Sequence, residues 1–261
     1  MRLKNIKDSK YGLSELVNEK SALNEIKRDL LDGTAFRIPH NLDREKLRKV
    51  RRSLDGDFNL YDNTYTARVQ KVKNYRQRHW DHDSQIVPAK YISWSFFPWN
   101  KESNELFSEL TDLFVLRNIL ANLDKHCYLD GKDPEATARL AFQFYPCGEG
   151  YMHEHQDPAS AHQLALPTLL LSEYGKDYKS GGFYALDQSN NQVIFDTELE
   201  FGDLTLFHPS IPHGVKKIDP DLKLSNCKSI SDGRLMMIAG VNGYAGKGAQ
   251  YDANVSDEAM L

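Results

Sequence analysis

The sequence predicts a mainly β fold with helical additions, in which N-terminal helices pack on a closed barrel or a double-sheet jelly roll. After Pro134 the chain consists of short runs rich in β-branched and aromatic residues, separated by Gly, Pro, Asp and Asn, which is typical of strands. No helical pattern separates these runs, whereas a parallel α/β fold needs a helix between successive strands. Before Pro134 the apolar residues recur mostly at helical spacing.

Length and composition indicate an ordinary globular chain. The 261 residues are 40% hydrophobic and 27% charged, a balance at which a chain folds around a core of its own. We therefore expect a single domain over residues 1–261. Within it, 1–136 should be mostly helical with flanking strands, 137–243 should form the β core, and 244–261 should be an irregular tail.

Three helices are expected before the β core. Apolar residues recur at steps of three and four over 13–31, and Gly33 follows as a stop signal. Residues 42–54 show a similar pattern, and 102–123 form a broad apolar face. We expect these helices to pack on the sheet rather than to carry chemistry.

Eight strands are expected in the core, and one more precedes it. The flanking strand covers 91–97 (YISWSFF). The core strands are expected at 138–145, 151–156, 165–172, 182–186, 192–196, 203–207, 213–218 and 235–241.

Charge and cysteine content argue against several classes of protein. The formal net charge of −4 provides no general field that attracts a polyanion, so nucleic acid is not the expected partner. Cys127, Cys147 and Cys227 are scattered and odd in number, which fits a reducing compartment better than a disulfide framework or a zinc site. Neither a signal peptide nor a membrane span is recognisable. A cytoplasmic location is expected.

A metal site is predicted from GEGYMHEHQDP and FHPSIPHGV. His155 and Asp157 are two residues apart, so a strand places both side chains on the same face. One imidazole and one carboxylate form two-thirds of the facial triad that binds ferrous iron and leaves coordination positions open. His213 follows a strand-like segment and a Pro turn, from which a later strand can return it to the same place.

Arg234 is the predicted anchor for a keto acid that occupies open positions on the metal. A keto acid with a second carboxylate needs a cation at its far end, and the planar fork of arginine suits a carboxylate. Arg234 begins the apolar strand RLMMIAGV, after the distal histidine. The competing interpretation is an ordinary arginine in a salt bridge.

Four blocks of the sequence together resemble the Fe(II)- and 2-oxoglutarate-dependent dioxygenases, in particular the prolyl-hydroxylase-like and phytanoyl-hydroxylase-like branch. The blocks are FQFYPCGEGYMHEHQD, SGGFYAL, GDLTLFHPSIPHGV and GRLMMI, and they cover about 138–243. The resemblance implies a double-stranded β-helix, which is a jelly-roll, cupin-like core. One departure is the stretch IDPDLKLSNCKSISDG between His213 and Arg234, which is longer than the family's usual gap.

The resemblance also implies roles for individual residues. His155, Asp157 and His213 take the positions of the catalytic metal ligands, and Arg234 takes the position that grips the far carboxylate of 2-oxoglutarate. Tyr145 matches a family position whose hydroxyl binds 2-oxoglutarate, with a place in the barrel core as the alternative. Gln143, on the same strand face, is expected to line the pocket. Fe(II), the co-substrate 2-oxoglutarate and O2 are the implied cofactors.

The expected reaction is hydroxylation of an unactivated C–H bond of a small molecule (an amino acid, metabolite or natural product), with release of succinate and CO2. Halogenating relatives carry a small residue where Asp157 stands, so a carboxylate there favours hydroxylation. Two alternatives remain open: a nucleic-acid demethylase of the same superfamily, and a cupin-like protein that binds a metal or ligand without oxidising it. No membrane partner is expected, and the sequence does not predict an oligomeric state.

A second His-x-Asp pair, His79 and Asp81, tests the specificity of the motif. It lies in the polar run YRQRHWDHDSQ, without a strand-like frame and without a suitable distal histidine and basic strand after it. We expect a role on the surface or in a substrate loop. The neighbouring basic run RVQKVKNYRQR is expected to be a solvated face.

Overall fold

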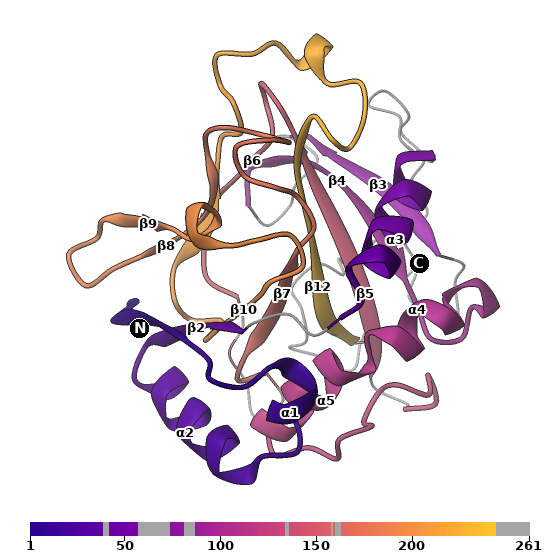
Figure 1. Ribbon diagram of the computed structural model, residues 1–261, viewed down its shortest axis with the longest axis vertical. Helices are drawn as coiled ribbons and strands as arrows, with labels where there is room; N and C mark the ends of the chain where they lie inside the picture. Colours follow the sequence, from indigo (N-terminus) through magenta and orange to yellow (C-terminus); the bar gives the residue numbers. More distant parts are fainter. Residues whose placement is uncertain are drawn as a thin grey trace.

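The computed structural model describes residues 1–38, 42–56, 74–80, 87–133, 136–157, 159 and 163–243. Its centre is a curled 12-stranded sheet (Figure 1). Eleven strands follow the order β1-β2-β10-β7-β12-β5-β4-β6-β11-β8-β9, and β3 pairs with β4. The strands are β1 (Asn5–Asp8), β2 (Thr34–Ile38), β3 (Tyr75–Trp80), β4 (Ala89–Phe96), β5 (Ala136–Pro146), β6 (Tyr151–His155), β7 (Leu166–Leu170), β8 (Gly182–Leu186), β9 (Gln192–Ile194), β10 (Leu204–Phe207), β11 (His213–Lys216) and β12 (Gly233–Gly243).

The helices lie on one side of this sheet, in the lower and right-hand parts of Figure 1. Helix α5 contacts β7 and β12, α2 contacts β2, and α1 packs on α5. The α-helices are α1 (Leu13–Leu16), α2 (Lys20–Leu31), α3 (Arg44–Gly56), α4 (Asn104–Glu109) and α5 (Thr111–Leu120). Short 3-10 turns occur at Lys101–Ser103, Asp196–Glu198 and Leu224–Asn226.

The two central strands, β5 and β12, pair along their whole length from Gly233 opposite Pro146 to Gly243 opposite Ala136. Successive residues of a strand point to opposite faces, and both strands have two different faces. One face carries apolar side chains that join the helices in the largest core cluster: Leu140, Phe142, Phe144, Leu235, Met237, Ala239 and Val241. The other face carries Gln143, Tyr145, Met236 and Ile238, which line a cavity.

The sheet closes over this cavity because β4 joins two parts of it. β4 pairs with β5 over most of its length and with β6 at Ala89 and Lys90. From there β6, β11, β8 and β9 form a smaller part that faces the larger one across the cavity. The fold is therefore mainly β, with a jelly-roll core and helical additions, as the sequence predicts.

Two expected helices are interrupted. The helix expected at 13–31 is divided into α1 and α2, and Glu19 caps the second by accepting a hydrogen bond from the Ser21 N–H. Gly33 ends α2 as expected, with a φ of 89° and a Cβ position that would lie 2.5 Å from the Arg2 carbonyl oxygen. The helix expected at 102–123 is divided at Leu110, where the backbone leaves the helical region.

The N-terminal part also contributes strands that the pattern did not predict, namely β1, β2 and β3. The basic run before Trp80 is not a solvated face at Arg76 and Arg78, which lie half-buried within β3. Their guanidinium groups lie over the rings of Trp94 and Trp80, at 5.7 and 4.3 Å from the ring centroids. His79 was also expected outside a strand frame, and it belongs to β3. Because β3 is polar in composition, the sequence pattern did not predict it as a strand. The stacking of its arginines on tryptophan rings stabilises it.

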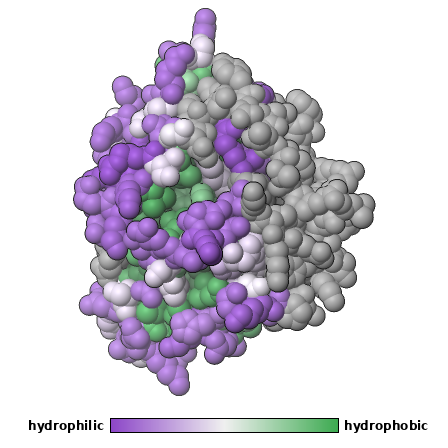
Figure 2. Space-filling model, turned by 90° about the vertical axis from the view of Figure 1, so that its right-hand side faces the viewer, coloured by the Kyte–Doolittle hydropathy of each residue, from purple (hydrophilic) through white to green (hydrophobic). Residues whose placement is uncertain are grey.

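Asp81 and the expected tail 244–261 lie outside the described residues. Within the described part of the chain, no helix has both the length and the apolar character needed to cross a bilayer. On the face shown in Figure 2, the described residues are mostly hydrophilic, and apolar residues appear in small patches between them.

The core between helices and sheet gives the first prediction. Phe142 is 1% exposed and packs edge-to-face against Phe96, with 5.6 Å between ring centroids. Replacing Phe142 by Ala leaves a cavity in this core, so we expect the free energy of unfolding to fall by about 3–5 kcal/mol. Urea denaturation measures the change. Leu222→Ala is the control, because Leu222 is 46% exposed; equal losses in both variants would contradict this description of the core.

Candidate metal centre

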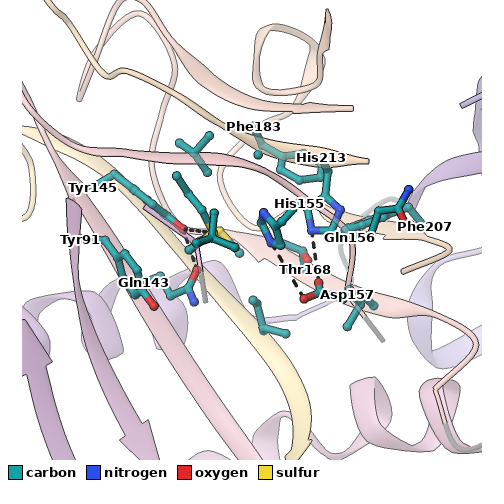
Figure 3. A pocket seen from close by; sticks show the side chains of 17 residues that line it. Tyr91, Gln143, Tyr145, His155, Gln156, Asp157, Thr168, Phe183, Phe207 and His213 are labelled. Atoms are coloured by element: carbon teal, nitrogen blue, oxygen red, sulfur yellow. Dashed lines mark hydrogen bonds and ion pairs between the residues drawn. The ribbon is translucent and has the colours of Figure 1, made fainter. Parts of the chain in front are cut away.

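The structure brings His155, Asp157 and His213 together, although they come from different strands. His155 ends β6, Asp157 follows it by two residues, and His213 begins β11. β6 and β11 are antiparallel neighbours, and His213 lies directly opposite His155. One ligand atom from each of the three residues lies within 4.8 Å of the others. Figure 3 shows the three side chains converging at one end of the cavity.

Both imidazole rings are oriented by backbone carbonyl groups. The Nδ1 atom of His155 lies 2.9 Å from the His153 carbonyl oxygen, and that of His213 lies 2.8 Å from the Ile211 carbonyl oxygen. A carbonyl oxygen only accepts, so in each ring Nδ1 carries the proton and donates it. The Nε2 lone pair of each neutral ring is then directed towards Asp157, which is the tautomer that a metal ligand needs.

The three groups lie so close together that their lone pairs and negative charge favour a cation between them. His213 Nε2 lies 3.2 Å from Asp157 Oδ2, and His155 Nε2 lies 3.9 Å from Asp157 Oδ1. With both rings neutral, lone pairs face a carboxylate, and this contact is repulsive unless a proton or a metal ion lies between them. The donor set therefore fits a divalent cation.

Electrostatics prepare the same three groups for metal binding. Burial, and then the charge of His213, lowers the pKa of His155, which favours its neutral form. Burial alone would raise the pKa of Asp157, but contact with His213 and the charges of His155 and Arg139 lower it below its ordinary value. Asp157 is thus ionised. Two imidazoles, which lose any added proton when they bind a metal, and one carboxylate on one side of an ion match the ferrous facial triad.

The metal centre opens into a cavity of about 750 Å³ including its mouth. Its wall is mainly apolar, with a few polar groups placed among aliphatic and aromatic side chains, as is usual for small-molecule sites. Gln143 and the hydroxyls of Tyr91 and Tyr145 provide most of the polarity on the side opposite the histidines, and Thr168 lies beside the metal ligands (Figure 3). The apolar part of the wall consists of Val87, Met152, Leu166, Phe183, Phe207, Val215, Met236 and Ile238.

Arg234 lies directly opposite the cavity residue Tyr145 on the neighbouring strand, just behind the cavity wall. It is 1% exposed. Its Nε and Nη2 donate to the two oxygens of Asp196 at 2.6 and 3.0 Å, so it forms the salt bridge of the competing interpretation. Its third nitrogen, Nη1, is buried without a hydrogen-bond partner among the described residues. A buried donor of this kind fits a carboxylate that enters from the cavity.

Asp196 fixes the orientation of this arginine. Its Oδ2 also accepts hydrogen bonds from the Tyr178 hydroxyl at 2.7 Å and from the Phe183 N–H at 2.9 Å. Burial alone would lower the pKa of Arg234, but the Asp196 carboxylate raises it. Gly182 allows this approach, because a Cβ there would lie 2.4 Å from Asp196 Oδ2, and its φ of 113° disfavours any side chain.

Tyr145 and Gln143 lie side by side on the cavity face of β5. The Tyr145 hydroxyl donates to Gln143 Oε1 at 2.8 Å. Tyr145 is 1% exposed and belongs to a small core cluster, yet its ring also lines the cavity. Burial raises its pKa well above the ordinary value, so the hydroxyl keeps its proton as a donor.

Sequence reasoning missed Asp196, Tyr178 and Thr168, which have no motif of their own. The two glycines in SGGFYAL were a signal, because a Gly with positive φ often marks a close approach of another group. His79 was also misplaced. Its ring stacks on that of Tyr91, a residue of the cavity wall, with 4.1 Å between ring centroids. His79 is therefore part of the sheet and not of a surface loop.

Solved structures that share this fold include 2-oxoglutarate- and iron-dependent oxygenases. A prolyl-4-hydroxylase from Pseudomonas putida is 15% identical, with a TM-score of 0.50 over 85% of this chain and 98% of that one. A prolyl hydroxylase from Trichoplax adhaerens, solved with a peptide of hypoxia inducible factor, is 14% identical, with a TM-score of 0.50 over 91% and 96%. The epimerase SnoN, solved with Fe3+, alpha ketoglutarate and nogalamycin RO, is 12% identical, with a TM-score of 0.50 over 88% and 89%.

No protein-family model matches the sequence, and no curated protein matches it either. At 12–15% identity, the structural likeness establishes the fold of this oxygenase class. The chain combines that fold with a His-Asp-His triad that could bind iron. Reaction and substrate have to be argued from the side chains.

His79 gives a prediction on pH. Burial, and then the charge of Arg139, lowers its pKa to about 3, whereas an unfolded His has a pKa of about 6.5. Between these values the unfolded chain binds a proton that the folded chain does not. The free energy of unfolding therefore falls as the pH is lowered, by at most about 1.4 kcal/mol per pH unit from this group.

Urea midpoints measured from pH 6.5 downwards test this expectation. His79→Gln should reduce the slope of stability against pH, because the group that titrates is gone. His126→Gln should leave the slope unchanged, since His126 is exposed. Identical slopes in His79→Gln and the wild type would show that His79 is not held neutral.

Proposed function

We propose that the protein is an Fe(II)- and 2-oxoglutarate-dependent oxygenase. The observation that carries the proposal is the pairing of two features: the convergent His155, Asp157 and His213 in the cavity, and the unpartnered Nη1 of Arg234 next to the cavity residues Tyr145 and Phe183. Metal ligands alone would suit many proteins. A buried cation placed beyond them suits a metal chelator that has a second, distal carboxylate.

In this proposal His155, Asp157 and His213 hold the iron and are the catalytic residues. The carbonyls of His153 and Ile211 keep the two rings in the ligating tautomer. Three ligands on one side leave the opposite positions free for a chelating keto acid and O2. When bound, iron would supply the oxidising chemistry with O2 as the oxidant: one oxygen atom would enter succinate as 2-oxoglutarate loses CO2, and the other would go to the substrate.

The residues at the other end position the co-substrate. Arg234 donates Nη1 to its distal carboxylate while Asp196 holds the other two nitrogens. The Tyr145 hydroxyl provides a second donor, and Gln143 sets its direction. Phe183 and Tyr145 flank the guanidinium, each with its ring centroid 5.9 Å from Arg234 Cζ, and they exclude water from the charged contact.

Hydroxylation of an unactivated C–H bond in a small molecule is the reaction that we favour. Asp157 occupies the metal position where a halide would otherwise bind, and the cavity is enclosed on most sides. The comparison proteins include one solved with a peptide and one solved with a natural product, so the fold itself accepts both kinds of substrate.

The two alternative functions require different features of the site. A cupin-like binding protein would need no distal cation, and Arg234 Nη1 would have no purpose in it. A nucleic-acid demethylase would need a basic approach to the cavity, whereas the chain has a net charge of −4. Conversion of 2-oxoglutarate to succinate separates the first alternative from the proposal, and salt-sensitive binding of DNA or RNA would support the second.

Replacing Asp157 by Ala tests the metal site. We expect wild-type protein, given Fe(II) and 2-oxoglutarate without oxygen, to develop the weak visible charge-transfer band of the chelate, and we expect the variant to lose it. The loss follows because two imidazoles alone bind ferrous iron weakly and leave no anionic ligand. Anaerobic absorption spectroscopy measures the band.

Glu154→Ala is the matched control, because Glu154 lies on β6 next to the metal ligand His155 and its side chain is exposed. It should keep the band at the wild-type intensity. A wild-type protein that binds iron but shows no band with 2-oxoglutarate would exclude the oxygenase and favour the cupin-like alternative.

Replacing Arg234 by Lys tests the anchor. Lys keeps a positive charge beside Asp196 but cannot contact Asp196 with two nitrogens and offer a third to a ligand. We expect the dissociation constant of 2-oxoglutarate to rise at least tenfold, which corresponds to about 1.4 kcal/mol. Titration of the charge-transfer band measures it.

A keto acid without the distal carboxylate, 2-oxobutyrate, provides the control ligand. Wild type should bind it much more weakly than 2-oxoglutarate, and Arg234→Lys should bind it as wild type does. An equal loss for both keto acids would mean that the substitution damages the metal end of the site instead of the anchor.

A further inference from the structure

A second arginine, Arg139, lies on the cavity face of β5. Alternate residues of a strand share a face, so the face that begins with Tyr145 continues through Gln143 and Ala141 to Arg139. Its direct neighbour on β12 is Gly240, which is on the same face as the cavity residues Met236 and Ile238. Arg139 is 5% exposed. A full positive charge is thus placed inside the fold.

Arg139 has no counter-ion or hydrogen-bond partner within the described part of the chain, and its Nε is buried and unsatisfied. A buried guanidinium nitrogen without a partner is costly for a protein to retain. Two arginines that are buried more completely keep hydrogen-bond partners, although each of them also has one unsatisfied nitrogen. Arg117 bonds to Asn118 and Gln163, and Arg234 bonds to Asp196.

The location of Arg139 relates it to the metal centre. It is close enough to Asp157 for its charge to lower the pKa of that carboxyl group. Six residues of extended strand, about 20 Å, separate Arg139 from Tyr145 and Arg234 at the other end of the face. Its neighbours on this face, Ala141 and Gly240, carry at most a methyl group, and Arg139 lies just beyond the residues that line the cavity.

A second unsatisfied group lies beside it. Asn242 is two residues beyond Gly240 on the same face, which makes it a diagonal neighbour of Arg139 at a separation of about 7–8 Å. Its side chain is completely buried, and neither its amide nitrogen nor its amide oxygen has a hydrogen-bond partner among the residues that the structure describes. The pair therefore offers a cation, a neutral donor and a neutral acceptor to one ligand.

We propose that Arg139 binds the carboxylate of the primary substrate, and that this substrate is a small organic acid with an amino or hydroxyl group near its carboxylate. The planar fork of Arg139 matches a carboxylate, and the amide of Asn242 matches the neighbouring polar group. The depth of Arg139 selects a small molecule. The inference rests on the proposed function, in which Arg234 binds the co-substrate and Arg139 is left for a second acid.

Thermal unfolding of the metal-loaded protein tests the inference without turnover. The protein is loaded with Mn(II) in place of iron and with 2-oxoglutarate. The probes are the proteinogenic L-amino acids and the corresponding 2-hydroxy acids, each paired with its own carboxamide, which lacks the negative charge. We expect at least one acid to raise the Tm of wild type by about 3 °C or more at saturating concentration, and we expect its carboxamide to have no effect.

Arg139→Met should abolish the shift caused by the acid, because Met fills the same space without a charge. Without probes, its Tm should equal or exceed that of wild type, since the unpaired charge is removed. Arg117→Met is the matched control: it removes a buried arginine that has partners, so its Tm should fall while the acid still raises it. A Tm loss in Arg139→Met as large as that in Arg117→Met would show that Arg139 is structural.

The same samples separate this inference from the proposed function. If Mn(II) and 2-oxoglutarate do not raise the Tm of wild type, the oxygenase proposal fails. If they do, and no acid acts or an acid acts equally on Arg139→Met, only the role of Arg139 is overturned. A weaker effect of 2-oxoglutarate itself on Arg139→Met would also overturn it, because Arg139 would then belong to the co-substrate.

Discussion

The uninterrupted pairing of β5 with β12 is the constraint on which the rest of the structure depends. Eleven opposed residue pairs keep two long strands in one register, so each strand has one face towards the helices and one towards the cavity. The helix face is entirely apolar and forms the largest core cluster. The cavity face carries the polar groups, Arg139, Gln143, Tyr145 and Arg234. A slip of one residue would exchange the two faces and would bury the arginines under the helices.

This two-residue period explains why the sequence revealed so much of the fold and the metal site. Short apolar and aromatic runs between turn residues predicted the strands, and the spacing of His155 and Asp157 predicted a shared face. His213 could be added because a proline turn and a strand place it opposite. The predicted triad comes together in the structure, with ligand atoms within 4.8 Å of one another; its role in iron binding is still a prediction.

Other features depend on contacts between distant segments, and no local pattern encodes them. Asp196 looked like the end of a strand, but it meets Arg234 only because the Gly182 turn leaves room for it. Strand β3 is polar in composition, and its arginines are stabilised by the rings of Trp80 and Trp94 on the sheet. Helices α1 and α2 were expected as one because their apolar residues continue the same period across the break. In each case the deciding partner lies far away in the sequence or has no signature.

The clamp on Arg234 restricts how this chain can change over evolutionary time. Asp196 is completely buried and satisfies two of the three guanidinium nitrogens. Losing the arginine alone would leave a buried carboxylate without its counter-charge, which typically costs several kcal/mol. Losing Asp196 alone would free the guanidinium to turn away from the cavity. Descendants that accept a different co-substrate should therefore carry paired replacements at 196 and 234. Gly182 should be replaced only in chains that have already lost Asp196.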